Sequence, residues 1–321
     1  MLAVMTAERP RIILDCDPGH DDVIAMVVAH LHTELVGVTT VAGNAPLDRT
    51  THNACVMRDV LDIGCGVHAG AARPLVAPPR FAGFVHGESG LDGADLPAPQ
   101  GGPDSDDAMG FIIDQCRLEE GLWLVPTGPL TNIALALRAA PDLADRVAGI
   151  SLMGGGTFGN RTPVAEFNIW ADPEAAHAVF GCGAPIVMAG LDVTHQFLVT
   201  RPRIDDVGAI GTSFTDLIAA LFEFFSGNYI SRHDGIEGAA LHDPLAVMVL
   251  THPHLFESTT RHVAVETRGE HTAGMTVVDR RLISDRESPN VEVLERVDAD
   301  AAWTIVLDAL RTAGEQAGTL S

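Results

Sequence analysis

Short apolar segments alternate with amphipathic segments along the first 190 residues of the chain. The apolar segments have the length and β-branched content of buried strands, and they cover residues 11–16, 35–43, 122–126, 147–153 and 184–190. The segments with helical periodicity between them cover residues 21–31, 47–63, 106–118, 130–140 and 172–182. Apolar strands separated by amphipathic helices predict a mostly parallel sheet covered by helices on both faces. The predicted fold class is therefore α/β.

The C-terminal third has a more helical pattern. We expect helices at 213–232, 238–250 and 301–313, with short strands at 261–267 and 275–278. No linker rich in Pro, Gly or Ser divides the chain, and no repeat of 20 to 50 residues is visible. The sequence thus predicts a single domain over residues 1–321 with helical additions in its C-terminal third.

The net charge of the chain argues against some classes of binding partner. The formal net charge is −23, from 43 acidic and 20 basic side chains, and every basic side chain is Arg. Such a surface repels phosphate backbones and anionic lipids, so we expect neither nucleic acid nor membrane as a partner. The five cysteines are scattered without a CxxC pattern, and the N-terminus lacks a basic segment followed by a long apolar one. We therefore expect a cytoplasmic protein with reduced thiols.

Polar and glycine-rich motifs follow the ends of the predicted strands. They read ILDCDPGHDD, TVAGN, VPTGPLTN, LMGGG and AGLDVTH. Ligands of parallel sheets bind outside the carboxyl ends of the strands. We therefore expect these motifs to meet at one site.

The first motif places four aspartates within eight residues, namely Asp15, Asp17, Asp21 and Asp22. Capping of the following helix would explain one or two of them, but four carboxylates in a poorly solvated cleft repel each other and protonate. A hard divalent cation such as Ca²⁺ or Mg²⁺ resolves that conflict. An EF-hand loop is rejected because its acidic twelfth position is missing, and an aspartate-nucleophile phosphatase is disfavoured because the chain has no Lys.

Two further polar clusters add to this chemistry. His242 and Asp243 interrupt the apolar segment ALHDPLAV, which we expect to be helical; His242 is either a core histidine or a proton donor beside the cation. Asn160, Glu166 and Asn168 follow a glycine-rich stretch that lacks the spacing of nucleotide phosphate loops. Together with Asn44, these side chains suit a polyhydroxylated ligand such as a sugar.

The ordered set ILDCDPGHDD, TTVAGN, HGESG, VPTGPLTNIA, LMGGG, AEFNIWADPEAA, HDP and GMTVVD resembles the inosine-uridine preferring nucleoside hydrolases over nearly the whole chain. The resemblance implies a Rossmann-like open sheet, a tightly held Ca²⁺ and a homodimer or homotetramer. The implied Ca²⁺ ligands are Asp17, Asp22, Asp243 and the backbone carbonyl of Thr127. Asp15 is implied to orient these ligands without contacting the ion itself. The residues implied to hold the ribose are Asp21, Asn44, Met153, Asn160, Glu166 and Asn168.

The implied reaction is hydrolysis of the N-glycosidic bond of ribonucleosides to ribose and free base. We expect Ca²⁺ to hold the attacking water and the ribose hydroxyls, Asp17 to accept the proton of the water, and His242 to protonate the departing base. His86, Tyr229 and His233 are the candidates for the base pocket, beside Phe84 and Phe225. Two alternatives stay open: a hydrolase of another ribosylated compound, and a non-catalytic Ca²⁺-dependent nucleoside or ribose binder.

Overall fold

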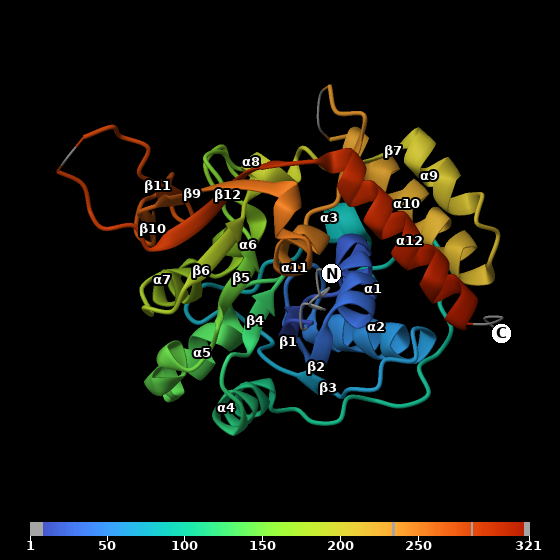
Figure 1. Ribbon diagram of the computed structural model, residues 1–321, viewed down its shortest axis with the longest axis horizontal. Coiled ribbons are helices and arrows are strands. Elements are labelled where there is room, and N and C mark those ends of the chain that lie inside the picture. The colour runs from blue at the N-terminus through green and yellow to red at the C-terminus, as the bar shows by residue number, and fades with distance from the viewer. Residues whose placement is uncertain (1–8, 233–234, 284, 318–321) are drawn as a thin grey trace, which may run out of the picture.

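The computed structural model describes residues 9–232, 235–283 and 285–317 of the chain. Its centre is one eight-stranded sheet, whose spatial order is β3-β2-β1-β4-β5-β6-β12-β9 (Figure 1). The strands are β1 Arg11–Cys16, β2 Glu34–Thr40, β3 Val67–Ala69, β4 Trp123–Pro126, β5 Gly149–Met153, β6 Ile186–Ala189, β9 Phe256–Arg261 and β12 Val291–Val297. All neighbouring strands pair in parallel except β9, which is antiparallel to β12 at the edge. The predicted α/β class with a mostly parallel open sheet is confirmed.

Helices cover both faces of the sheet (Figure 1). One apolar core lies under α1 His20–His32, α2 Leu47–Val60, α8 Leu191–Thr194, α9 Arg201–Gly208, α10 Ser213–Ile230, α11 Pro244–Thr251 and α12 Ala299–Ala317. The other lies under α4 Ala108–Leu118, α5 Thr131–Ala139, the 3₁₀ helix η1 Pro141–Asp145, α6 Phe167–Ala171 and α7 Pro173–Phe180. Short helices α3 Gly83–His86 and η2 Pro253–Leu255 lie in connections.

Strand β1 shows how the sequence produces these layers. Ile12, Leu14 and Cys16 point into one core and Ile13 into the other, because successive side chains of a strand point to opposite faces. Asp15 has the same parity as Ile13 and accepts a hydrogen bond from Asn132 of α5. Asp15 and Cys16 therefore lie on opposite faces of the sheet.

The C-terminal third differs from the prediction in its strands. The predicted strands at 261–267 and 275–278 correspond to β10 Val263–Val265 and β11 Thr276–Val278, which form a separate two-stranded sheet. The central sheet instead gains β12 and β9, which the sequence analysis did not identify. In β12, Val291, Val293 and Leu294 are buried between charged residues, so the segment lacks the continuous apolar run of an interior strand.

The predicted helix at 238–250 is wrong in its first half. Residues Gly238–Ala240 form strand β8, which pairs with β7 Leu198–Thr200, and helix α11 begins only at Pro244. Proline fits the first position of a helix because its missing N–H would have no partner there. A Cβ at Gly238 would lie 2.1 Å from the Val199 carbonyl oxygen, so glycine permits the close pairing of β7 with β8. His242 and Asp243 therefore lie in the connection that enters the helix.

The order of the strands fixes the position of the site. The chain moves from β1 to β2 and β3 on one side, and then returns to β4 on the other side of β1. The loops that follow β1 and β4 consequently diverge at this switch point, which is where parallel sheets bind ligands. The backbone N–H of Thr127 after β4 donates to the Asp15 carbonyl at 2.8 Å and ties the two loops together.

Among the described residues, no helix combines the length and apolar character needed to cross a bilayer.

Candidate active site

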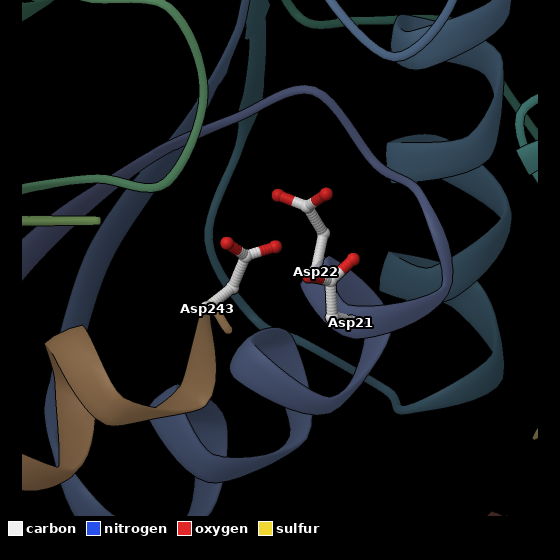
Figure 2. Close-up of side chains that lie close together, drawn as sticks. All are labelled: Asp21, Asp22 and Asp243. Atoms are coloured by element: carbon white, nitrogen blue, oxygen red, sulfur yellow. The ribbon is translucent and has the colours of Figure 1, made fainter. Parts of the chain in front are cut away.

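Three carboxylates from two distant segments meet at the carboxyl edge of the sheet. Asp21 and Asp22 lie in the first turn of α1, and Asp243 immediately precedes α11. Figure 2 shows the three side chains turned toward one another, and one oxygen from each lies within 4.8 Å of the others. All three residues are at most 5% exposed. The amino terminus of α1 favours negative charge, but one helix end does not compensate three buried carboxylates.

Asp17 lies beside this group. One of its oxygens, Oδ2, accepts a hydrogen bond of 2.6 Å from the Asn44 backbone N–H. The other, Oδ1, is buried and has no hydrogen-bond partner among the described residues. A Cβ at Gly128 would lie 2.5 Å from this Oδ1, so only glycine lets the loop after β4 approach the carboxylate so closely.

Asp22 joins the loops after β1, β2 and β4. Its Oδ1 accepts from the Thr127 hydroxyl at 2.8 Å, and its Oδ2 accepts from the Gly19 N–H at 2.9 Å and from Asn44 Nδ2 at 3.1 Å. Asp15 lies behind them, where Thr39 Oγ1 at 2.6 Å and Asn132 Nδ2 at 2.8 Å donate to its Oδ1. The Asp15 side chain thus contacts strand β2 and helix α5 and does not line the cleft.

Burial raises the pKa of every carboxyl group in this cluster. The pKa of Asp21 rises to about 8, mainly through burial and secondly through the charge of Asp22. The pKa values of Asp17 and Asp243 rise well above their usual range, for which burial is again the main cause and neighbouring carboxylates add to it. The pKa of Asp22 is also raised by burial, although hydrogen bonds from Gly19 and Thr127 oppose the shift. The isolated cluster would therefore hold protons at neutral pH.

The predicted sugar-binding residues form the adjoining wall. Asn168 Nδ2 donates to the carbonyls of Thr127 at 2.7 Å and Met153 at 3.2 Å. The Glu166 carboxylate accepts the backbone N–H groups of Gly155, Asn168 and Ile169 at 2.8 to 3.1 Å. The Gly-rich backbone therefore binds a carboxylate of the chain itself. Burial raises the pKa of Glu166 to about 7, against the effect of these hydrogen bonds.

One cleft joins the two groups of residues. The predicted residues that line it are Asp21, Asn44, Phe84, His86, Thr127, Met153, Asn160, Glu166, Asn168, Phe225, Tyr229, His242 and Asp243. Asp17 and Asp22 do not line this cleft, and they adjoin the lining residues Asn44 and Thr127 through the hydrogen bonds given above. His233 lies outside the described residues. The structure thus brings together segments from across the chain.

His242 is held from two sides at the wall of the cleft. Its Nδ1 lies 2.8 Å from the Thr194 hydroxyl, and its Nε2 lies 3.4 Å from the Tyr229 hydroxyl. The Tyr229 hydroxyl also lies 3.2 Å from His195 Nε2. These contacts fix the plane of the imidazole within a cleft that also holds Asp243. His242 therefore lines the cleft with both ring nitrogens close to hydroxyl groups of the chain.

His86 belongs to a stacked aromatic wall. Its ring centroid lies 5.3 Å from that of His20 and 5.4 Å from that of Phe225. Its Nδ1 lies 3.1 Å from His20 Nδ1, and His20 Nε2 lies 2.9 Å from the Asp92 carbonyl oxygen. Burial lowers the pKa of His86 well below its usual value, and the nearby histidines lower it further. Burial likewise lowers the pKa of His20 to about 4, so both rings are neutral at physiological pH.

Several site residues were not identified from the sequence. Arg161 and Phe167 line the cleft, and Thr194 contacts His242. Arg161 is adjacent to Asn160, and Thr194 lies in the AGLDVTH motif after β6. The only sequence signal for these two residues was therefore their position after a strand, since parallel sheets bind ligands outside the carboxyl ends of their strands.

The chain matches the family described as inosine-uridine preferring nucleoside hydrolase over residues 12–304. It belongs to that family. A pyrimidine-specific ribonucleoside hydrolase RihA of Shewanella baltica is 44% identical over 94% of this chain and 96% of its own length. A RihA of Escherichia coli is 42% identical over 94% of this chain and 98% of its own length. The structure of a purine-preferring ribonucleoside hydrolase from Gardnerella vaginalis superposes with a TM-score of 0.89 at 31% identity, covering 95% of this chain and 99% of that one.

These comparisons confirm the resemblance and the enzyme class. The chain is a nucleoside hydrolase, an N-glycosidase that acts on ribonucleosides. Members of this family of nucleoside hydrolases share the fold described above, and the parallel sheet with its switch point is the frame that holds the acidic cluster and His242. The alternative of a non-catalytic binder is therefore not favoured.

Proposed function

We propose that this nucleoside hydrolase requires Ca²⁺ and that it prefers pyrimidine ribonucleosides. The observation that carries the first part is the meeting of the buried carboxylates Asp21, Asp22 and Asp243, with the buried Asp17 beside them, at a cleft that also contains His242. Carboxylates crowded in this way stay ionised only beside a compensating positive charge. The chain contains no Lys, and none of the described arginines forms an ion pair with these four carboxylates.

The donor atoms fit a hard divalent cation. Asp17 Oδ1 and Asp21 Oδ1 are buried without a hydrogen-bond partner in the described part of the chain, which costs free energy unless a ligand contacts them. Asp17, Asp22, Asp243 and the Thr127 carbonyl would hold the cation, and Ca²⁺ takes oxygen donors of these kinds. The bound cation would supply the positive charge that keeps the carboxylates ionised and that attracts ribose hydroxyls.

The residues of the chain divide the chemical work between the acidic cluster and the wall of the cleft. Asp17 accepts the proton of the attacking water, because its Oδ1 makes no hydrogen bond within the described chain. Asp21, Asn44, Asn160, Glu166, Asn168 and the Met153 main chain orient the ribose. Crowded carboxylates also favour the positive charge that develops on the ribosyl group in the transition state.

His242 acts on the leaving group. Thr194 and Tyr229 hold its ring in one orientation, so the imidazole can donate a proton to the base as the glycosidic bond breaks. The Tyr229 hydroxyl forms part of the same chain of contacts and stays protonated, because burial raises the pKa of Tyr229 above its usual value. Protonation makes the base a better leaving group.

The preference for pyrimidines rests on the two RihA relatives, which are named pyrimidine-specific and match over 94% of this chain. The wall formed by His86, Phe225 and Tyr229 supplies both ring faces and polar ring atoms for a base. Such a wall can bind a planar base by stacking and a polar edge by hydrogen bonds.

Turnover of uridine, cytidine and inosine tests the proposal. The protein is dialysed against a chelator, its calcium content is measured, and release of reducing sugar is followed before and after Ca²⁺ or Mg²⁺ is added back. We expect uridine and cytidine to be cleaved faster than inosine, with activity lost on calcium removal and restored by Ca²⁺. Full activity in calcium-free protein would refute the metal requirement, and faster cleavage of inosine would refute the pyrimidine preference.

A further inference from the structure

His20 connects the helix that carries Asp21 and Asp22 to the loop that carries His86. It is the first residue of α1 and is only 1% exposed. Its Nε2 lies 2.9 Å from the Asp92 backbone carbonyl oxygen, and its Nδ1 lies 3.1 Å from His86 Nδ1. The proposed function gives His20 no role, although this residue adjoins both the acidic cluster and the wall of the cleft.

The contact with Asp92 fixes which nitrogen of His20 carries the proton. A backbone carbonyl oxygen only accepts hydrogen bonds, so Nε2 of His20 is the protonated nitrogen. The His20 ring lies against the rings of Phe224 and Phe225, at centroid distances of 5.6 and 5.2 Å, and burial lowers its pKa to about 4. The ring is therefore neutral, and a neutral imidazole has one N–H only. Nδ1 of His20 is left as a bare acceptor.

The Nδ1 atoms of His20 and His86 point at each other. The ring centroids are 5.3 Å apart, which exceeds the 3.1 Å between the nitrogens by about one imidazole radius for each ring. Both nitrogens therefore lie close to the line between the ring centres, where two bare nitrogens would repel each other. Because Nδ1 of His20 is bare, Nδ1 of His86 is the donor of this hydrogen bond. Burial keeps the His86 ring neutral, since it lowers the pKa of His86 well below its usual value, so Nε2 of His86 has no proton.

A second donor reaches the same nitrogen of His86 but fits it less well. The backbone N–H of His20 lies 3.3 Å from His86 Nδ1, farther than the ring nitrogen and away from the line between the rings. This N–H belongs to the first turn of α1, where backbone N–H groups have no acceptor within the helix. If the side-chain acceptor of His20 were removed, this N–H would become the partner of His86, which would then carry its proton on Nε2. His20 thus selects between the two tautomers of His86.

Nε2 of His86 is the nitrogen that a bound molecule can reach. Within the described residues it has no hydrogen-bond partner and is not enclosed, and His86 lines the cleft. The His86 ring lies 5.4 Å from that of Phe225, which lies 5.9 Å from that of Tyr229. The Tyr229 hydroxyl in turn lies 3.4 Å from His242 Nε2. These contacts place His86 on the same continuous wall as His242, the proposed acid for the leaving base.

We propose that His20 is a positioning residue that holds His86 in the tautomer protonated on Nδ1, so that His86 Nε2 accepts a hydrogen bond from an N–H group of the base. The inference rests on the proposed function, which puts the base at this wall. Uridine offers a ring N–H and cytidine an amino group, whereas the base of pyrimidin-2-one riboside has no N–H. A bare acceptor that faces such a base loses its hydrogen bond to water without a replacement, which weakens binding.

Nitrogen NMR of the wild-type enzyme with its calcium bound tests the tautomer directly. The histidine rings are isotopically labelled, and the signals of His86 are those that disappear in His86→Gln. The chemical shift separates a bare ring nitrogen from a protonated one, and couplings to the ring C–H groups separate Nδ1 from Nε2. We expect His86 to be protonated on Nδ1 and His20 on Nε2 at neutral pH. A proton on Nε2 of His86 would overturn the proposal.

Two variants of similar volume separate the acceptor of His20 from its packing. His20→Asn keeps an acceptor oxygen near the position of Nδ1, so it should preserve the tautomer of His86. His20→Leu has no acceptor, so His86 should move its proton to Nε2. We expect the ratio of kcat/KM on uridine to that on pyrimidin-2-one riboside to fall about tenfold in His20→Leu and to stay within about twofold of the wild-type ratio in His20→Asn. Differences in the intrinsic reactivity of the two substrates cancel, because each ratio is compared with that of the wild type.

Each other outcome counts against the proposal. An equal fall of the ratio in both variants would assign the effect to packing, and an unchanged ratio in His20→Leu would exclude the hydrogen bond between His86 and the base. If His20→Leu does not fold, the wild-type spectrum and His20→Asn decide the inference. Failure of the proposed function is a separate result, because the spectrum needs no turnover and reports the tautomers even if the enzyme prefers inosine or needs no calcium.

Discussion

The hydroxyl of Thr127 donates a 2.8 Å hydrogen bond to Asp22 Oδ1 and so connects the loop after β4 to the first turn of α1. This bond spans the switch point of the sheet, where the loops after β1 and β4 separate. It fixes the Asp22 carboxylate relative to the Thr127 carbonyl, and both are proposed to hold the cation. The hydroxyl itself need not touch the ion.

Replacement of Thr127 by Val tests this role of the hydroxyl. The variant keeps the backbone carbonyl but removes the donor to Asp22, so we expect calcium affinity to fall about 10- to 100-fold, as is usual when a group that orients a ligand is lost. Competition with a chromophoric chelator measures the affinity. Thr131→Val is the matched control, because the Thr131 hydroxyl binds Asp172 away from the cluster. An equal loss of affinity in both variants would contradict the prediction.

His242→Ala should separate chemistry at the leaving group from the rest of the reaction. We expect kcat on uridine to fall by about 10² to 10⁴, the usual contribution of a positioned general acid. Cleavage of 4-nitrophenyl riboside, whose leaving group needs no proton, should be nearly unchanged. Steady-state kinetics on both substrates gives the answer, and equal losses on the two would refute the assignment of His242 as the acid.

Gly128→Ala tests the close approach of the loop after β4 to Asp17. The added Cβ would lie 2.5 Å from Asp17 Oδ1 and 2.9 Å from a Val41 methyl group, so the carboxylate must move. We expect at least a tenfold loss in kcat, since misplacement of a reacting group by about 1 Å can cost about 10²-fold. Circular dichroism should show a folded protein.

Gly208→Ala is the control for that variant. Gly208 lies in helix α9, and a Cβ added to it would meet no atom within 4 Å apart from its chain neighbours and the backbone of its own helix, so alanine there should leave activity unchanged and raise stability slightly. Full activity of Gly128→Ala would show that the Asp17 position is not critical.

The stability of the calcium-free protein should fall as the pH rises. The pKa of Asp21 is about 8 in the folded state, above the value of about 3.9 for an unfolded chain, so the folded state binds more protons between these values. The stabilising contribution is thus fully present below about pH 4 and is lost as pH rises through about 8. Bound calcium should reverse this trend, because it favours the ionised carboxylates.

Urea unfolding in chelator at pH 5, 6.5 and 8 measures this dependence. The Asp21→Asn variant lacks the carboxyl group, so its free energy of unfolding should change less over the same range. Exposed groups such as Asp279, whose pKa is lowered by Arg281, contribute equally to both proteins and cancel in the comparison. Identical slopes for the two proteins would contradict a raised pKa at Asp21.

Local sequence was sufficient for the central part of the fold. The apolar run Ile12–Leu14 and the helical pattern after Asp21 specify β1 and α1, because strand and helix periodicities depend on neighbours within a few residues. The expectation that the carboxyl ends of parallel strands form the ligand site then placed Asp17, Asn44 and Thr127 at one edge of the sheet. Strand β12 was missed because its pairing with β6 and β9, rather than its composition, places it in the sheet.

The sequence by itself determined the parallel α/β layout and the surplus of acidic side chains at the carboxyl edge, since both follow from periodicity and from the order of motifs. Only the tertiary structure decided that one oxygen of Asp243 lies within 4.8 Å of oxygens of both Asp21 and Asp22, and that Thr194 contacts His242. Both relationships join residues that are far apart in the sequence. They arise from the packing of helices on the sheet, which no local pattern encodes.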